Sequence, residues 1–196
     1  CKPGMVAYDV GANIGYVSLV LARIVGMSGQ VYAFEALPEN VQRMTEHVSL
    51  NSLQSVIHLV PYAVSDCEGR EVFLVHLSHA MGKLAGSSGR EANYVDKLEV
   101  KSVRLDDFVY RDGNLPPDLI KMDIEGGGVK AIPGMLRILK EHRPICFMEL
   151  HGAEEQTVAW SALEHSGYSI CYMRKGYPKV GSMNALAFKE HIVALP

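Results

Sequence analysis

The chain has 196 residues, a length that fits one folded domain, and 48% of them are hydrophobic, which is enough for a full core. The formal net charge of -3 excludes the basic field that binding to a nucleic acid backbone needs. No apolar stretch approaches the roughly 20 residues of a membrane-spanning helix. The four cysteines are too widely spaced for a zinc site or a disulfide framework, so we expect a reducing, cytoplasmic setting. From the charge and the apolar stretches we expect neither nucleic acid nor membrane partners.

Apolar runs and helical periods alternate in the first part of the chain. We predict strands over residues 6–10, 31–34 and 56–60, with helices over residues 16–25 and from Pro38 and Asn40 onward. One face of the first helix is expected to be buried, and so is one face of the second: Val17, Val20, Leu21 and Ile24 in the first, and Val41, Met44 and Val48 in the second. This alternation predicts a parallel sheet covered by helices. Because the first strand follows Cys1 so closely, we expect that an N-terminal part of the natural chain precedes it.

The middle of the chain interrupts this pattern. Two predicted strands, residues 71–75 and 98–103, flank a Gly- and Ser-rich stretch from His79 to Tyr94. We expect residues 71–103 to form an inserted antiparallel hairpin in place of a crossover helix, with a loop that shapes a substrate pocket.

The parallel pattern then resumes and closes the fold. We predict strands over residues 119–124 and 145–150 and helices over 131–142 and 157–165, with Gly134 kinking or dividing the first of these helices. Residues 169–173 and 185–188 are predicted to form a closing hairpin that contributes an antiparallel strand. The fold class is therefore α/β, a Rossmann-like and mostly parallel sheet with helices on both faces, in a single domain over residues 1–196.

A glycine-rich loop, Asp9 to Gly15, lies between the first strand and the first helix. Such a loop at the carboxyl end of a parallel strand is typical of nucleotide binding, and Asn13 tolerates the positive φ of a tight turn. A dinucleotide fingerprint would require glycine at positions 13 and 16, where this chain has Asn13 and Tyr16. Asp9 favours a cationic ligand over a pyrophosphate. A turn with only a structural role is the other interpretation.

Glu35 ends the second predicted strand. An acid at this position can accept hydrogen bonds from both ribose hydroxyls of an adenosine. Both NAD enzymes and S-adenosylmethionine enzymes use such an acid, so Glu35 alone does not distinguish them.

Ionisable residues follow the next two parallel strands: Asp123, Glu125, Glu149 and His151. Because the carboxyl ends of neighbouring parallel strands meet at one edge of a sheet, these side chains can converge over one cleft. Packing does not readily explain four such groups, although one or two of them can serve as helix caps, as Glu125 could.

Taken together, these stretches resemble the FkbM-type methyltransferase family over most of the chain. The resemblance rests on residues 8–15, 34–40, 63–66, 105–108, 121–126 and 148–151 in this order and spacing. It implies a class I methyltransferase fold, an S-adenosylmethionine donor and methylation of a hydroxyl on a sugar, polyketide or other small molecule. The donor-binding residues that it implies are Asp9, Gly11, Ala12, Asn13, Gly15, Glu35, Ala36, Ala63 and Asp123.

Two departures from the family pattern concern the site. The family usually continues its fourth-strand motif as Glu-Gly-x-Glu, whereas Glu125-Gly126 is followed here by Gly127-Gly128, so the second carboxylate is missing. Many class I methyltransferases place an acid after the third strand to bind the adenine amino group, and Ala63 stands there. Backbone groups near Ala63 or the nearby Asp66 would have to replace that acid.

Catalysis of hydroxyl methylation can follow two routes. His151 can act as a general base, because its unperturbed pKa lies near the working pH. Alternatively, Asp123 and Glu149 can hold a magnesium ion that orients the hydroxyl and lowers its pKa. We favour the base without a metal, because it needs no further ligands. An NAD-linked oxidoreductase and a non-catalytic nucleotide-binding module are the alternative functions, and the three consecutive glycines are the best argument for the latter.

Overall fold

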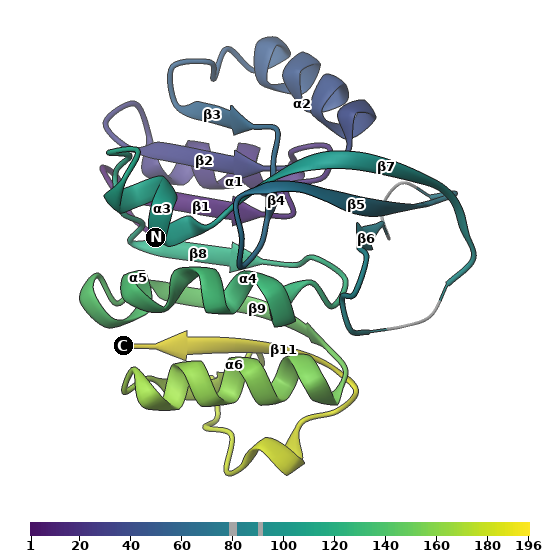
Figure 1. Ribbon diagram of the computed structural model, residues 1–196. Helices are drawn as coiled ribbons and strands as arrows, with labels where there is room; N and C mark the ends of the chain where they lie inside the picture. The colour runs from purple at the N-terminus through teal and green to yellow at the C-terminus, as the bar shows by residue number, and fades with distance from the viewer. Residues whose placement is uncertain (79–81, 90–91) are drawn as a thin grey trace.

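A seven-stranded, mostly parallel sheet organises the computed structural model, which describes residues 1–78, 82–89 and 92–196 (Figure 1). The strand order is β10-β11-β9-β8-β1-β2-β3. Five strands run parallel: β1 (Val6–Val10), β2 (Gln30–Phe34), β3 (Ile57–Val60), β8 (Leu119–Met122) and β9 (Ile145–His151). The sheet is completed by β10 (Ser169–Tyr172) and by β11 (Lys189–Leu195), which is antiparallel to both of its neighbours. The predicted fold class is confirmed.

Helices cover both faces of this sheet. Because successive strand residues point to opposite faces, Ala7 of β1 packs with the helices α1 (Tyr16–Val25) and α2 (Pro38–Leu50), while Tyr8 packs on the opposite face. That opposite face carries α3 (Leu105–Tyr110), α4 (Gly128–Ala131), the 3₁₀ helix η1 (Ile132–Met135), α5 (Leu136–Glu141) and α6 (Ala153–His165). None of the helices in the described ranges combines the length and apolarity needed to cross a membrane.

The buried face of α1 differs from the predicted one. Val20 and Ile24 are 45% and 41% exposed, whereas Ser18, Ala22 and Val25 are buried together with the correctly predicted Leu21. The helix is apolar over most of its circumference, so its periodicity did not distinguish the two faces. The hydroxyl of Ser18 donates a hydrogen bond to Asp9 of β1, which explains why a polar residue lies on the sheet side.

A second, four-stranded sheet projects beyond the carboxyl ends of the parallel strands (Figure 1). It contains β4 (Ala63–Val64), β5 (Gly69–His76), β6 (Lys83–Leu84) and β7 (Tyr94–Val103) in the order β4-β7-β5-β6. The long strands β5 and β7 pair antiparallel, as the sequence predicted. Of the predicted pocket-shaping loop, residues 79–81 and 90–91 lie outside the described residues, and β6 occupies part of the remainder.

Several predicted boundaries were wrong. The last strand is not residues 185–188: Ala185 ends the 3₁₀ helix η2 (Met183–Ala185), and the strand begins at Lys189. Its first residues alternate exposed and buried among charged side chains, which concealed the strand from a search for apolar runs. The helix predicted over residues 131–142 begins at Gly128 and is divided around Pro133 and Gly134, and α3 was not predicted.

Candidate active site

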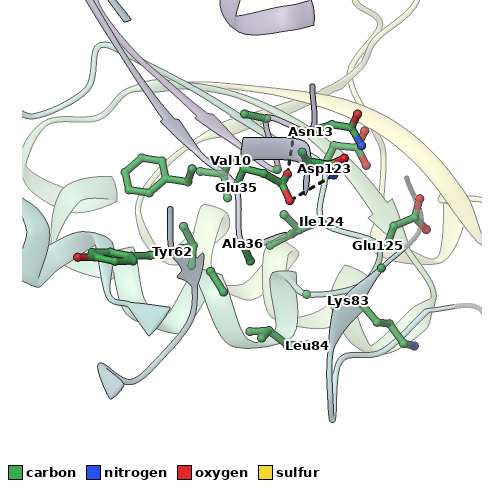
Figure 2. Close-up of a pocket in the computed structure, with 18 of the residues that line it drawn as sticks. Val10, Asn13, Glu35, Ala36, Tyr62, Lys83, Leu84, Asp123, Ile124 and Glu125 are labelled. Carbon is green, nitrogen blue, oxygen red and sulfur yellow. Dashed lines mark hydrogen bonds between the residues drawn. The ribbon is translucent and has the colours of Figure 1, made fainter. Parts of the chain in front are cut away.

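A cavity of about 340 Å³ lies at the carboxyl ends of the parallel strands, between them and the second sheet. This volume is in the range of small-molecule and cofactor sites. Most of the predicted site residues border it: Gly11, Ala12, Asn13, Glu35, Ala36, Ala63, Asp123 and Glu125. Glu35 lies between Tyr62 at one end of the cavity and Glu125 and Lys83 at the other (Figure 2).

The loop after β1 adopts the left-handed backbone that its sequence predicted. Asn13 has a φ of 52°, and its side-chain oxygen accepts a hydrogen bond from the backbone N–H of Ile14 at 2.8 Å. Gly11 has a φ of 77°, and a Cβ there would overlap the carbonyl oxygen of Asp123. Gly15 instead packs against Met44 at the start of α1 and does not border the cavity. Glycine at position 11 therefore lets β1 and the segment after β8 approach each other at the cavity.

Glu35 fixes this loop from the neighbouring strand. Its Oε2 accepts a hydrogen bond from the backbone N–H of Asn13 at 2.8 Å. Its Oε1 accepts from the backbone N–H of Leu37 at 2.9 Å and from the side chain of Asn40 at 3.4 Å. Burial raises the pKa of the Glu35 carboxyl, although these hydrogen bonds oppose the shift. A carboxylate offers about four lone-pair sites, two on each oxygen. Two of these hydrogen bonds are on Oε1 and one is on Oε2, so Oε2 retains acceptor capacity.

Asp9 is placed differently from the expectation. Its side chain is fully buried behind the loop and does not border the cavity. It accepts a hydrogen bond from the Ser18 hydroxyl at 2.6 Å and forms an ion pair with Lys121, 3.1 Å away. Burial raises the pKa of Asp9 despite these two favourable partners.

Lys121 is a site residue that the sequence analysis did not identify. It pairs with Asp9 in the register of β1 and β8, and its Nζ donates a hydrogen bond to the Gly11 carbonyl at 2.8 Å. Unlike Asp9, it borders the cavity. A lysine inside an otherwise apolar buried strand was the available signal, because a charged side chain there needs a partner.

The end of the cavity near Tyr62 is apolar. Ala36 forms an apolar wall of the cavity together with Ala63, Val64, Phe73 and Leu84, all four of which belong to the second sheet. No carboxylate stands at Ala63, as the sequence already indicated. This wall suits a flat, apolar ring system better than a charged group.

The opposite end, which we call the acidic end, carries the carboxylates of Asp123 and Glu125 together with the amine of Lys83. The side chains of Asp123 and Glu125 border the cavity and are partly exposed, and Glu125 has a φ of 50°. His151 lies behind them with only 4% of its surface exposed and does not border the cavity. Its Nε2 is 3.6 Å from Asp123 Oδ1 and 3.2 Å from Glu149 Oε1, and its Nδ1 is 3.6 Å from Glu125 Oε2. The three carboxylates therefore meet around the imidazole ring of His151.

This environment changes the titration of His151. Burial by itself would lower the pKa of the imidazole, but the polar contact with Asp123 and the charges of Glu125, Glu155 and Glu149 outweigh it, so the pKa is raised. Burial likewise opposes ionisation of Asp123, yet the contact with His151 and nearby lysines hold the pKa of this carboxyl below its usual value. The raised pKa extends the protonated form of the imidazole to higher pH.

Glu149 faces Lys189 and His191 rather than the cavity. Lys189 of β11 forms an ion pair with its Oε1, and His191 Nε2 lies 2.8 Å from its Oε2. A magnesium ion held by Asp123 and Glu149 would have to displace these two side chains from Glu149. Within the described ranges, the group whose ligand atoms lie within 4.8 Å of one another is instead Asp123, Glu125 and His151.

Comparison with known proteins identifies the family of this chain. Residues 9–170 match the Methyltransferase FkbM domain. The chain belongs to this family. The match extends from Asp9 in β1 to the start of β10 and thus includes all the described residues that border the cavity. The FkbM resemblance predicted from the motifs is confirmed.

Individual relatives are more distant. The hexuronic acid methyltransferase AglP of Haloferax volcanii is 28% identical over 69% of this chain and 52% of its own length. Methyltransferase FkbM from Methylobacillus flagellatus superposes with a TM-score of 0.64 at 16% identity, over 100% of this chain and 44% of the other. Aeropyrum pernix fibrillarin, solved with natively bound S-adenosylmethionine, superposes with a TM-score of 0.56 at 11% identity, over 100% and 67%. The chain thus spans about half the length of AglP, and the structural likenesses show the shared fold.

Proposed function

We propose that the protein is an S-adenosylmethionine-dependent methyltransferase that methylates a hydroxyl oxygen of a small molecule, with a sugar as the favoured class. The observation that carries the proposal is the arrangement around Glu35. Its carboxylate holds the glycine-rich loop and borders a cavity with one apolar and one acidic end. S-adenosylmethionine has the matching sequence of groups: a flat adenine, a ribose diol and a positively charged sulfonium.

The residues fit this donor along the length of the cavity. Glu35 would accept hydrogen bonds from the ribose hydroxyls, and the adenine would rest beside Ala36 and Ala63. The Gly11–Gly15 loop would lie under the amino acid portion, with Lys121 as a cation for its carboxylate. Asp9 would then act on the donor only through Lys121 and the loop. When bound, the donor supplies an electrophilic methyl group, and the positive charge beside it favours the acidic end.

We assign binding of the methyl acceptor to the acidic end of the cavity, beside Asp123 and Glu125, and call it the acceptor end. Methyl transfer mainly needs alignment of the acceptor oxygen, and removal of the hydroxyl proton helps an aliphatic hydroxyl to react. Because His151 lies behind the two carboxylates, the proton would move first to a carboxylate oxygen of Asp123 or Glu125. A neutral His151 ring would then take the proton from that carboxylate, so the base that the sequence favoured would act through Asp123 or Glu125. Glu149 would hold the ring in place from the other side.

A sugar is the favoured acceptor because a relative that matches 69% of this chain is a hexuronic acid methyltransferase. The NAD-linked alternative is disfavoured by Asn13 and Tyr16, which stand where the dinucleotide fingerprint requires glycine. The non-catalytic alternative predicts binding without turnover.

The first experiment compares ligands by thermal protection. S-adenosylhomocysteine should raise the melting temperature and NADH should not, since binding to the native state alone stabilises a fold. Methyl-labelled S-adenosylmethionine with hexuronic acids and neutral sugars then tests for turnover. Protection by NADH alone would refute the proposal, and S-adenosylhomocysteine binding without transfer to any hydroxylated acceptor would favour the binding module.

A second experiment separates the two catalytic routes. Full activity in EDTA, together with a collapse of activity in His151→Ala, supports the route without a metal. Activity that disappears in EDTA and returns with magnesium would instead support a metal at the acidic end.

A further inference from the structure

Glu155 is a buried carboxylate that links two segments of the acidic end. It lies in the first turn of α6 and is 1% exposed. Its Oε1 accepts a hydrogen bond from the backbone N–H of Gly128 at 2.7 Å, and its Oε2 accepts from the backbone N–H of His151 at 2.5 Å. Gly128 begins α4, three residues after Glu125, and His151 ends β9.

Helix capping alone does not account for both contacts. An acid in the first turn of a helix often accepts a hydrogen bond from the backbone N–H of its own N-cap residue. That residue is Gly152 in α6, whereas Glu155 accepts from His151, one residue earlier in β9. The contact with Gly128 joins a different helix, and α4 and α6 lie in the same layer (Figure 1). Burial of a carboxylate is costly unless hydrogen bonds compensate for the lost water, and here one oxygen serves each segment.

Gly128 makes this approach possible. A Cβ at residue 128 would overlap Glu155 Oε1, so any larger residue would displace the carboxylate. This is the position where the family pattern usually has a glutamate. In this chain the carboxylate beside residue 128 is supplied by α6.

We propose that Glu155 is a positioning residue for the acceptor end of the site. By holding the start of α4 against the end of β9, it sets the separation between Glu125 and His151 and so keeps both beside Asp123. The inference rests on the proposed function for its catalytic consequence. Glu155 does not border the cavity, so its effect on catalysis passes through the residues it holds.

The test compares Glu155→Gln and Glu155→Ala with Glu154→Gln, an exposed neighbour in the same helical turn. A glutamine keeps one acceptor oxygen and replaces the other with a donor, so Glu155→Gln should lose one contact and Glu155→Ala both. In both Glu155 variants, kcat for methyl transfer to D-glucuronic acid should fall about 10- to 100-fold, because small misplacements at a site have effects of that size. In Glu154→Gln, kcat should stay at the wild-type value. Calorimetric affinity for S-adenosylhomocysteine should remain at the wild-type value in all three variants.

Nuclear magnetic resonance tests whether Glu155 positions His151, and it needs no methyl acceptor. The amide resonances of Gly128 and His151 and the ring nitrogen resonances of His151 should shift in both Glu155 variants but not in Glu154→Gln. Gly128→Ala should also shift the His151 resonances when Glu155 is present. The double variant Gly128→Ala/Glu155→Ala should show the same His151 resonances as Glu155→Ala alone, because no carboxylate is left for the new Cβ to overlap. Wild-type His151 ring resonances in Glu155→Ala would overturn the inference, even if its melting temperature fell. Failure of the wild-type protein to bind S-adenosylhomocysteine would instead count against the proposed function.

Discussion

The carboxylate of Glu35 accepts a hydrogen bond from the backbone N–H of Asn13 at 2.8 Å, so the acid that ends β2 holds the loop that follows β1. The two residues are 22 positions apart in the chain and meet because β1 and β2 pair in parallel, with Val10 opposite Phe34. The loop and the proposed ribose acceptor are therefore one unit, and a change to Glu35 affects both.

Replacement of Glu35 by alanine should weaken binding of S-adenosylhomocysteine by about 1.5–3 kcal/mol, because a charge-assisted acceptor pair is lost. Titration calorimetry of the variant beside wild type measures this directly. Glu46→Ala, at an exposed position of α2, is the control and should bind normally. Unchanged affinity in Glu35→Ala would remove this residue from the donor site.

Substitution of Ala36 by tryptophan should block the donor without unfolding the protein. Ala36 is partly buried and borders the apolar end of the cavity, so a large ring there would occupy the volume proposed for adenine. We expect at least about a tenfold loss of S-adenosylhomocysteine affinity, equal to 1.4 kcal/mol, with little change in melting temperature. Ala153→Trp, at an exposed position of α6, should leave affinity unchanged. Retained affinity in Ala36→Trp would mean that adenine lies elsewhere.

Asp9→Ala should destabilise the fold as well as disturb the loop. It removes the buried partner of Lys121 and the acceptor of the Ser18 hydroxyl. The expected cost is about 3 kcal/mol, the lower end for a broken buried ion pair, because Lys121 keeps some contact with water. Chemical denaturation gives the free energy of unfolding, and Asp96→Ala on the exposed side of β7 serves as the control. A cost equal to that of Asp96→Ala would show that the pair contributes little.

The raised pKa of His151 predicts a pH-dependent contribution to stability. A histidine whose folded-state pKa is raised stabilises the fold while protonated. The contribution is fully present below the unfolded-state pKa of about 6.5 and is lost as the pH rises through the folded-state value. The free energy of unfolding of wild type relative to His151→Gln should therefore be largest below about pH 6.5 and should decrease at higher pH. His165→Gln, an exposed position at the end of α6, is the control. A difference that grows with rising pH would contradict the assignment.

Much of this protein could be predicted from local patterns. Short apolar runs ending in glycine or an acid identified β1, β2, β8 and β9, because a strand buried on both faces needs apolar residues at successive positions. The positive φ of Asn13 followed from its place in a glycine-rich turn. The proximity of Asp123, Glu125, Glu149 and His151 followed from topology, since parallel strands bring their carboxyl ends to one edge. Their expected convergence over one cleft holds only for Asp123 and Glu125, because Glu149 and His151 do not border the cavity.

Other features depended on partners far away in the chain. The sequence contains Lys121 and Asp9 but does not show that they pair across 112 positions, or that the pair turns Asp9 away from the cavity. The buried face of α1 was decided by the sheet and by Asp9, because the helix is apolar on more than one side. The tertiary structure also brought Glu155 to Gly128. By itself, then, the sequence determined the order of elements and the chemistry at the strand ends, which follow from local periodicity and residue type. Only the tertiary structure decided which charged groups neutralise one another and which remain at the cavity, because long-range packing sets those distances.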